Sequence, residues 1–491
     1  MDAGQQAQDM ALFVEKALGN SLSRAALRFC TKRCKCGRRV EIALEEYAGL
    51  KPKMCVGCKI SSKIINFTIS SLAKRGKVKD TDLMLCIKEP YWRKGLATVM
   101  EGIAHFGITK PFTGSSPFLI VWNITKACNL ACKHCYEDAH IRAPDELTTE
   151  EALAAVDKLA DAGIAYIAVS GGEPLMRPDF FQIAEHMKKK NIALSIATNG
   201  TLITKENAKK LKDVNCLYAQ VSLDGSNAKT HNEFRGRESF ERTIEGIKNL
   251  VENGISVGVS CTVTKHNYHE VEEAIDLSEK IGASIFMHYN FIPTGRGKEI
   301  TKLDISPQQR EKLLLMLAKQ SGKRKVALLS TAPQYARVCS GFAVGSLTHF
   351  DIFGKDPEMA KVSSFLADFV GGCGTGRLYL AMEPNGDIKP CVFIPVKIGN
   401  IKESDFREMW LENRSLREIR DRKKFIGHCA ICEFRASCGG CRARSYGYYG
   451  DLVHADPGCM LNVKDWEKIT GKKSRKAGKK GKGKKVVKKR K

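Results

Sequence analysis

The chain has 491 residues, of which 43% are hydrophobic, and this length predicts two or three domains. No apolar run is long enough to cross a membrane, and the polar start MDAGQQAQDM lacks the pattern of a signal peptide, so we expect a cytoplasmic protein. The formal net charge is +26, but thirteen Lys and Arg residues lie in 472–491, a stretch without acidic residues. This tail is predicted to be disordered. It could solubilise the protein or bind nucleic acid, an acidic partner or a membrane surface.

Cysteine is unusually frequent, and most of the nineteen cysteines fall into three groups. Five lie within 30–58, three within 128–135 and seven within 373–459. Because cytosolic thiols are normally kept reduced, metal or cluster ligation explains these groups better than disulfides do. The other four are expected to be small buried hydrophobic residues: Cys86, Cys216, Cys261 and Cys339.

The first predicted domain covers residues 1–110 and begins with a helix over 1–29, where apolar residues recur at helical spacing. Two close pairs of cysteines follow, in CKC and in CVGC, and such pairs can close a tetrahedral zinc site. Cys30 is a spare ligand that could replace Cys34, and an iron–sulfur cluster or no metal are the alternatives. The predicted ligands of this zinc-ribbon-like module are Cys34, Cys36, Cys55 and Cys58.

From residue 118 onward, short apolar runs alternate with amphipathic segments, of which 149–163 and 271–283 are predicted helices. Alternating strands and helices imply a parallel sheet, because each helix returns the chain to the start of the next strand. Six such units form an open doubly wound sheet or a partial barrel, and we expect an α/β fold with a partial (β/α)6 TIM-like barrel over 111–325. The predicted strands are 118–125, 164–172, 193–200, 217–225, 255–264 and 284–292.

The sequence ACNLACKHCY places three cysteines within eight positions, immediately after the first predicted strand. Ligand sites of parallel α/β folds lie at the carboxyl ends of the strands, so the loop is expected at such a site. A structural zinc site needs four ligands, whereas three thiolates can hold three irons of a cubane cluster and leave the fourth iron open. The predicted ligands, and the catalytic centre, are Cys128, Cys132 and Cys135.

With Tyr136 after the third cysteine, the C-x3-C-x2-C spacing resembles that of the radical SAM superfamily. The resemblance implies an oxidoreductase or maturase with a 4Fe–4S cluster whose free iron binds S-adenosylmethionine. It also implies that an electron, from a reductant such as ferredoxin or flavodoxin, breaks the carbon–sulfur bond of S-adenosylmethionine. The resulting 5′-deoxyadenosyl radical would then abstract a hydrogen atom from the substrate.

The resemblance further implies cofactor-binding residues at the ends of the next predicted strands. The glycines of SGGEP (170–174) would let the backbone approach the ligand, and Glu173 would accept from the methionine ammonium group. Ser222 and Asp224 would hydrogen-bond the ribose hydroxyls, and Arg235 would pair with the methionine carboxylate. The full set is Tyr136, Ser170, Gly171, Gly172, Glu173, Asn199, Ser222, Asp224 and Arg235.

The seven cysteines of 373–459 resemble the SPASM extension of radical SAM enzymes, which carries auxiliary 4Fe–4S clusters. One departure from the family pattern is that only two residues separate Cys438 from Cys441. The resemblance implies two ligand sets, and the set formed by Cys373, Cys391 and Cys441 lacks an evident fourth thiolate. Cys339 could supply this fourth thiolate, the cluster of this set could have an open iron, or only one cluster forms. The alternative to iron–sulfur clusters is a zinc-binding knuckle domain. The implied sets are Cys429, Cys432, Cys438 and Cys459 for one cluster, and Cys373, Cys391 and Cys441 for the other.

The predicted domains after the barrel are a linker and SPASM-like region over 326–465, with the linker around 321–334, and the basic tail from 466 to 491. SPASM enzymes commonly modify peptides or proteins, and we slightly favour a peptide or protein substrate, with auxiliary clusters relaying electrons.

The C-terminal stretch CGGCRARSYGYYGDLVHADPGC also resembles that of family members that trim haem-type tetrapyrrole side chains by decarboxylation or deacetylation. There Arg442 and Arg444 could pair with propionates or neutralise thiolate charge. Two further alternatives are an RNA-modifying enzyme that uses the zinc module and the tail, and an iron–sulfur electron carrier. No nucleic-acid-binding motif is recognisable in the sequence.

Overall fold

The computed structural model describes residues 20–76, 79–340 and 370–471. Three expectations reach outside these ranges, namely the first nineteen residues of the N-terminal helix, residues 341–369 of the linker and SPASM-like region, and the basic tail after residue 471. The described part of that helix is α2 (Ser21–Cys30), which begins after Asn20, whose side chain accepts a hydrogen bond from the Ser23 amide.

Six parallel strands coincide with the six apolar runs of the sequence, and they are neighbours in chain order. Most of their side chains are buried, as expected for strands that are covered on both faces. The strands are β3 (Leu119–Asn123), β4 (Tyr166–Ser170), β5 (Ala193–Thr198), β6 (Cys216–Ser222), β7 (Ser256–Val263) and β8 (Ile285–Asn290).

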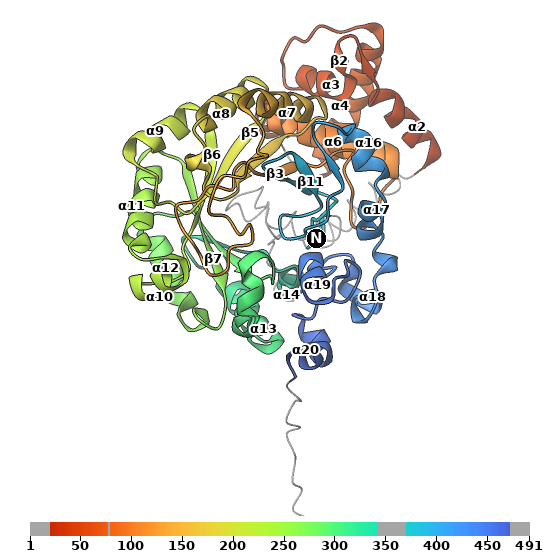
Figure 1. The fold of residues 1–491 in the computed structure, drawn as a ribbon. Coiled ribbons are helices and arrows are strands. Elements are labelled where there is room, and N and C mark those ends of the chain that lie inside the picture. Colours follow the sequence, from red (N-terminus) through yellow and green to blue (C-terminus); the bar gives the residue numbers. More distant parts are fainter. Residues whose placement is uncertain (1–19, 77–78, 341–369, 472–491) are drawn as a thin grey trace, which may run out of the picture.

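Helices surround the strands on the outside (Figure 1). The two predicted helices are present as α7 (Thr149–Asp161), which starts with a capping box formed by Thr148 and Glu151, and α12 (Val271–Lys280). Strands inside and helices outside confirm the partial barrel. The other helices of this part are α8 (Phe180–Lys189), α9 (Lys205–Asp213), α10 (Ala228–Arg235), α11 (Ser239–Glu252), α13 (Pro307–Gln320) and α14 (Gln334–Ser340).

The sheet extends beyond the six predicted strands at both ends and has ten strands in all. β9 (Ala327–Ser330) pairs parallel with β8, so part of the expected linker is a further strand; its apolar run is shorter than those of the predicted strands. At the other end, β10 (Tyr379–Met382) pairs parallel with β3 and is followed by antiparallel β11 (Asp387–Lys389) and β12 (Gly399–Asn400). The cysteine-rich C-terminal part thus joins the barrel beside the strand that precedes the three-cysteine loop.

Buried charged side chains join the C-terminal helices to the barrel. Asp304 accepts from Arg310 at 2.7 Å and lies 2.9 Å from Arg444, which also lies 3.3 Å from Asp456. All four side chains are at most 1% exposed, so each needs its partners to offset the loss of hydration. The helices are α16 (Phe406–Glu412), α17 (Arg414–Arg420), α18 (His428–Ile431), α19 (Arg442–Tyr449) and α20 (Val463–Thr470).

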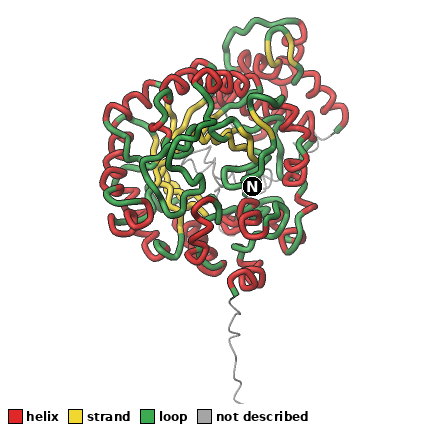
Figure 2. Tube along the Cα trace, viewed as in Figure 1, coloured by secondary structure: helices red, strands yellow, loops and turns green. Residues whose placement is uncertain are grey.

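The N-terminal module is mainly helical and contains one short hairpin, as Figure 2 shows. The hairpin pairs β1 (Arg33–Cys34) with β2 (Gly37–Arg38). The module is therefore a helical unit with a hairpin and not a β-rich ribbon. Its other helices are α3 (Arg39–Tyr47), α4 (Val56–Gly76), α5 (Asp80–Lys88) and α6 (Pro90–Phe106).

This module contacts the barrel at the ends of α7 and α8. Arg33 donates to the Asp161 carbonyl, and Lys94 donates to the carbonyls of Lys190 and Asn191, at 3.0 Å each. Because each helix returns the chain to the start of the next strand, these helix ends adjoin the amino ends of β4 and β5. The module therefore lies at the opposite end of the barrel from the three-cysteine loop.

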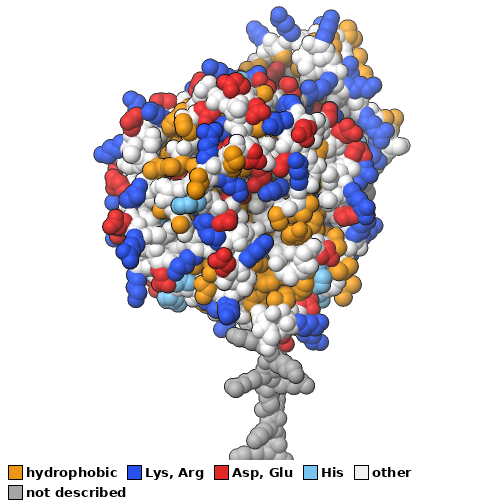
Figure 3. Space-filling view, in the orientation of Figure 1, with side chains coloured by type: hydrophobic (Ala, Val, Ile, Leu, Met, Phe, Trp, Pro, Cys, Tyr) orange, Lys and Arg blue, Asp and Glu red, His pale blue; other side chains and the backbone are white. Residues whose placement is uncertain are grey.

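None of the described helices is long and apolar enough to span a membrane. On the face that Figure 3 shows, Lys and Arg side chains are interspersed with Asp and Glu. Thirteen of the basic residues behind the net charge of +26 belong to 472–491, outside the described ranges.

Substitution of Trp410 tests the packing that stabilises the C-terminal part of the structure. Its side chain is fully buried, its indole N–H donates to the Gly114 carbonyl at 2.9 Å, and the Arg420 guanidinium lies 4.2 Å from the ring centroid. Trp410→Ala is expected to lower the free energy of unfolding by about 3–5 kcal/mol, because it leaves a cavity and an unpaired carbonyl. The midpoint of urea unfolding measures this loss. Arg414→Ala, whose side chain is 91% exposed, should change it by less than about 0.5 kcal/mol, and equal effects of both variants would contradict the expectation.

Candidate active site

The three cysteines of ACNLACKHCY lie in the loop between β3 and α7, at the carboxyl end of the sheet. The Cys128 N–H donates to the His140 carbonyl at 3.2 Å, and Arg296 donates to the Cys132 carbonyl at 2.9 Å and to Asp138 at 2.8 Å. Burial, with the charges of the other two cysteines as a further cause, raises the pKa of Cys128 to about 11. Ionised thiolates at this place need a bound cation such as iron.

Two glycines bring the end of β4 against the cysteine loop. A Cβ on Gly171 would lie 2.6 Å from the Thr125 carbonyl oxygen, and one on Gly172 would lie 2.1 Å from that of Ala127. The Gly172 N–H donates to Thr125 at 2.7 Å, and the Glu173 N–H donates to Ala127 at 2.8 Å. The sequence analysis expected these glycines to let a ligand approach the backbone. In the structure they are needed because the cysteine loop packs directly against them.

Glu173 is fully buried between the ends of β4 and β5. Its carboxylate accepts from the Thr198 hydroxyl and from the Asn199 N–H, both at 2.8 Å. Burial raises the pKa of Glu173 to about 7, although these hydrogen bonds favour the ionised form. A nearby cation would stabilise the ionised form of such a buried carboxyl, which suits the predicted contact with an ammonium group.

Asn199 connects the end of β5 to the cysteine loop. Its side-chain amide donates to Asn129 at 2.8 Å, and its side-chain oxygen accepts from the Thr201 N–H at 2.9 Å. Asn129 follows the first loop cysteine, so Asn199 positions the loop. Ser222, the last residue of β6, is half-buried at the same edge of the sheet.

Asp224, Arg235 and His134 form a buried charged cluster beside the loop. One Asp224 oxygen accepts from the Arg235 Nε at 2.5 Å and lies 3.2 Å from the His134 Nε2, while the other accepts from the Thr262 N–H at 2.6 Å. Burial would raise the pKa of Asp224, but Arg235 and His134 hold it well below its usual range. Both oxygens are thus occupied within the protein, so the contacts of Asp224 favour a role in holding Arg235 over the expected role in binding ribose.

Arg235 also reaches the cysteines. Its Nη1 lies 3.8 Å from the Cys132 Sγ and its Nη2 lies 3.3 Å from the His134 Nε2. Burial would lower the pKa of Arg235, but Asp224 and Cys132 raise it above its usual value. The sequence analysis did not select His134, which stacks on Phe234 with ring centroids 4.5 Å apart; its place between two loop cysteines was the available signal.

Tyr136 meets a polar network that the sequence analysis did not predict. Its hydroxyl is 2.9 Å from the Ser170 hydroxyl and donates to the Asn123 side-chain oxygen at 3.2 Å. The Asn123 amide donates to Glu137 at 2.7 Å and to Glu383 at 3.2 Å. Burial, and next the charge of Glu383, raise the pKa of Glu137 to about 7.

Two lysines complete this network: Lys126, shortly after β3, and Lys389, the last residue of β11. Lys126 lies 3.4 Å from Glu137, and Lys389 lies 2.9 Å from Glu383. Their side chains are 33% and 20% exposed. No motif signals the network because Asn123 and Glu383 are 260 positions apart in the chain.

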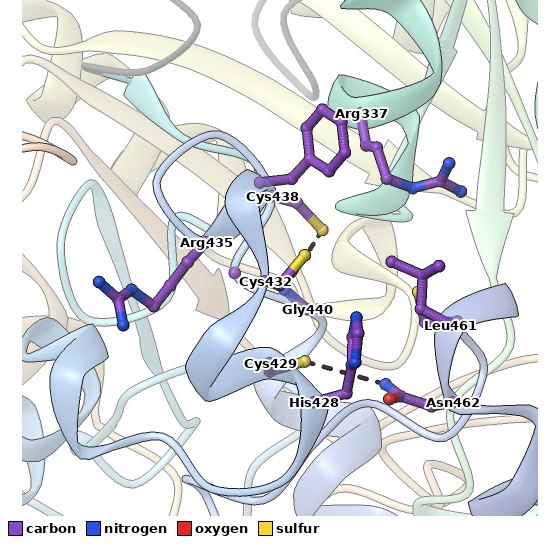
Figure 4. A pocket seen from close by; sticks show the side chains of 12 residues that line it. Arg337, His428, Cys429, Cys432, Arg435, Cys438, Gly440, Leu461 and Asn462 are labelled. Carbon is purple, nitrogen blue, oxygen red and sulfur yellow. Dashed lines mark hydrogen bonds between the residues drawn. The ribbon is translucent and has the colours of Figure 1, made fainter.

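Four C-terminal cysteines line one cavity, and they are the four that the SPASM resemblance groups together. Figure 4 shows Cys429, Cys432 and Cys438 around this cavity with Asn462. The Asn462 amide lies 3.9 Å from the Cys429 Sγ, and burial raises the pKa of Cys459 to about 12. Four thiols around one space fit the ligand set of a 4Fe–4S cluster.

The second predicted set is also brought together, since the thiols of Cys373, Cys391 and Cys441 are near enough for their charges to interact. The Tyr379 hydroxyl donates to the Cys391 Sγ at 2.9 Å. Cys339, one candidate for a fourth thiolate, belongs to the main hydrophobic core of the barrel. Residues 340–372 contain no cysteine that could take its place.

Three buried arginines gather around Cys373, namely Arg377, Arg422 and Arg442. Arg377 and Arg422 donate to the Cys373 carbonyl at 2.8 and 3.3 Å. Burial lowers the pKa of Arg422 to about 10, while the neighbouring cysteine charges oppose that change. A negatively charged cluster at these cysteines would offset the three cations.

The burial and contacts of Arg442 and Arg444 do not favour the first of their two expected roles, pairing with propionates. The two residues are 1% and 0% exposed, and their guanidinium groups are used inside the protein. Arg442 donates to the His454 carbonyl at 2.8 Å, and Arg444 pairs with Asp304 and Asp456. For Arg442 the position favours the other expected role, neutralisation of thiolate charge.

The N-terminal cysteines Cys34, Cys36, Cys55 and Cys58 converge, with their sulfur atoms all within 4.8 Å of one another. Of the isolated cysteines, Cys216, Cys261 and Cys339 are buried as expected, whereas Cys86 is exposed. Cys86 lies on α5, whose first turn and last turn are charged and whose only fully buried residue is Ile87.

Comparison with known proteins agrees with this geometry. Residues 122–278 match the radical SAM superfamily, and residues 373–438 match SPASM, an iron–sulfur cluster-binding domain. The AdoMet-dependent heme synthase of Methanosarcina barkeri is 36% identical over 355 residues, which cover 70% of this chain and 97% of that protein. The mycofactocin maturase MftC of Mycolicibacterium smegmatis is 30% identical, with 70% and 83% covered. The structure of Streptococcus suis SuiB bound to the precursor peptide SuiA has a TM-score of 0.59 at 17% identity and covers 86% of this chain and 93% of that chain.

This chain belongs to the radical SAM superfamily and carries a SPASM domain. It is therefore an enzyme, and the family implies 4Fe–4S clusters and S-adenosylmethionine as its cofactors. The resemblances to the radical SAM superfamily and to the SPASM extension are confirmed.

Gly172→Ala tests the close approach of β4 to the cysteine loop. Its Cβ would stand 2.1 Å from the Ala127 carbonyl oxygen, so the loop must move. We expect 5′-deoxyadenosine formation by the reconstituted enzyme to fall on the order of 100-fold, because small displacements of reacting groups carry large rate penalties. The matched control is Gly95→Ala in α6, where the nearest atoms to a Cβ would lie 3.8 Å away. An unchanged rate in Gly172→Ala would contradict this expectation.

Proposed function

We propose that this enzyme trims the propionate side chains of a haem-type tetrapyrrole by oxidative decarboxylation. The observation that carries the proposal is the 36% identity to the M. barkeri heme synthase, which extends over 97% of that protein. The match to the mycofactocin maturase is weaker, at 30% identity over 83% of that protein. These relatives favour the tetrapyrrole alternative over the peptide substrate that the sequence analysis preferred.

When bound, the clusters and S-adenosylmethionine supply a 5′-deoxyadenosyl radical and sites that exchange electrons. On the substrate, loss of one hydrogen atom from the propionate carbon next to the ring, loss of CO2 by carbon–carbon cleavage and loss of one electron leave a vinyl group. Within this chain, Cys128, Cys132 and Cys135 are the cluster ligands. Glu173 would accept from the methionine ammonium group, and Arg235, which lies beside Cys132, would offset thiolate charge and pair with the methionine carboxylate.

Lys126 and Lys389 are the residues we propose to bind propionates. Lys126 follows β3 in the cysteine loop and Lys389 ends β11, and their side chains are partly exposed, at 33% and 20%. Each already faces a carboxylate, Glu137 or Glu383, at 3.4 and 2.9 Å. Because burial and Glu383 raise the pKa of Glu137 to about 7, this glutamate can take up a proton. Lys126 would then keep its hydrogen bond to the Glu137 carbonyl at 2.9 Å, and its charge would be available to a propionate.

The test of the proposed function is anaerobic turnover of the reconstituted enzyme with dithionite, S-adenosylmethionine and an iron porphyrin that carries four propionates. We expect 5′-deoxyadenosine together with porphyrin products that have each lost one CO2 and two hydrogen atoms per side chain. A Cys128→Ala, Cys132→Ala, Cys135→Ala variant is expected to give neither product. Deoxyadenosine from the unaltered enzyme with an unchanged porphyrin would refute the tetrapyrrole substrate.

A peptide substrate is the second candidate, favoured by the similarity to the mycofactocin maturase. The two candidates differ in what stimulates cleavage of S-adenosylmethionine. A rise in deoxyadenosine formation with a ribosomal precursor peptide, and none with the porphyrin, would support the second candidate.

The raised pKa of Glu173 predicts how the binding of S-adenosylmethionine depends on pH. Its pKa of about 7 lies above the usual value, so in the ligand-free protein its ionised fraction increases as the pH rises through 7. The ionised form is the one that attracts an ammonium group, and affinity should therefore rise about ten-fold between about pH 6 and about pH 8. Equilibrium dialysis of the reconstituted protein measures this change. The Glu173→Gln variant should bind S-adenosylmethionine more weakly, and its affinity should no longer depend on pH in this way. The same pH dependence in the variant would assign the titration to another group.

A further inference from the structure

We propose that Cys34, Cys36, Cys55 and Cys58 bind one Zn²⁺ ion in a tetrahedral site that holds the N-terminal module together. The four sulfur atoms lie within 4.8 Å of one another. Within the described ranges, this is the only group of three or more Cys, His, Asp or Glu residues that is so compact. The site is separate from the loop and SPASM cysteines, and it does not depend on the proposed substrate.

The distances between the sulfur atoms identify the kind of group that fits. Cys34 lies 3.4 Å from Cys58 and 3.8 Å from Cys55, and Cys55 lies 3.6 Å from Cys58. Four sulfurs at 2.3 Å from one tetrahedral zinc ion are about 3.8 Å apart, whereas a disulfide joins sulfurs at about 2.0 Å. In a cubane cluster each thiolate binds a different iron, which keeps the sulfurs farther apart. The observed spacing therefore fits one ion.

The local backbone aims each pair of thiols at the same point. Cys34 ends β1 and Cys36 lies in the hairpin turn, and the Cys36 N–H is hydrogen-bonded to the Cys34 sulfur. Cys55 precedes α4 and Cys58 lies in its first turn, and the Cys58 N–H is hydrogen-bonded to the Cys55 sulfur. The two turns are thus preformed for metal binding, each with one amide that supports a thiolate.

Residues around the four cysteines suit a negatively charged centre. A zinc ion with four thiolates carries a net charge of minus two, and the Arg39 guanidinium lies near the Cys34 sulfur. Arg39 is itself held by the Phe29 carbonyl at 3.2 Å and lies over the Phe29 ring. Cys30, the spare ligand of the sequence analysis, is 0% exposed and belongs to the core of the module. Cys34 and not Cys30 is therefore the fourth ligand.

The module has a structural need for this ion. Its larger apolar core contains eight buried residues within the described ranges, half of them alanine or cysteine, and units with so little core commonly depend on a metal or on disulfides. The site would connect the hairpin to the start of α4, across α3 and the segment 48–54. All four ligand positions come from the protein, which is typical of structural zinc and leaves no place for a substrate. The core residues are Cys30, Val40, Ala43, Leu44, Ala48, Ile65, Ile87 and Ala97.

Metal analysis of the full chain, purified anaerobically without chelators, tests the site. We expect about one zinc per chain. Cys55→Ser/Cys58→Ser should lower zinc at least ten-fold and leave the iron content unchanged. The matched control is Cys86→Ser, an exposed cysteine of the same module, which should keep its zinc. Conversely, the Cys128→Ala, Cys132→Ala, Cys135→Ala variant should lose iron and keep zinc. Wild-type protein without zinc, iron in its place, or equal zinc in all variants would overturn the proposal.

Cobalt substitution of the unaltered chain covers the case in which the double variant fails to fold. Replacement of zinc by Co²⁺ should give the visible bands and sulfur-to-metal charge-transfer absorption of a tetrahedral four-thiolate site. Zinc added back should remove them. A spectrum of octahedral Co²⁺, or none, would exclude four-thiolate coordination. Because the module lies at the far end of the barrel, the zinc-depleted variant should still cleave S-adenosylmethionine at the loop.

Discussion

The parallel pairing of β10 with β3 is the contact on which the arrangement of the site depends. Tyr379–Met382 pairs with Leu119–Trp122, and the chain on either side of these strands carries the two kinds of cysteine site. The pairing brings Glu383 to Asn123 and places the start of β10, with Tyr379, against Cys391. A strand, which cannot slip by one residue without turning its side chains over, fixes these positions more firmly than a linker would.

Buried charge is the second constraint on this part of the molecule. The group of Arg310, Arg444, Asp304 and Asp456 balances its charges within the protein. The arginines around Cys373 are different, since their described partners at short distance are mostly carbonyl groups. Burying a cation without a counter-charge is costly, so the thiolates and the cluster that they would hold complete the second group. The metal-binding residues and the stability of the C-terminal part are therefore linked.

Much of the fold and of the metal sites could be predicted from the sequence, because the signals are local. Each of the six apolar runs became a strand, and the spacing of the three cysteines identified the loop. The two C-terminal sets were implied by the resemblance to SPASM, and the structure brings the members of each together. The C-x-C and C-x2-C pairs likewise converge. β9 escaped detection because only four residues pair, which gives too short an apolar run.

Properties that depend on distant parts of the chain could not be predicted. The sequence gives no sign that both oxygens of Asp224 are occupied by Arg235, His134 and Thr262. The burial of Arg442 and Arg444 depends on carbonyls and carboxylates from other elements, and the network around Asn123 joins residues 260 positions apart.

The burial of the SPASM cysteines has a consequence for how the protein is made. Cys391, Cys438, Cys441 and Cys459 are only 2–8% exposed, and Cys459 comes from the last described turns of the chain. Clusters held by these cysteines would therefore be covered by protein, so their assembly and the folding of the C-terminal part would have to be coordinated while the enzyme is made.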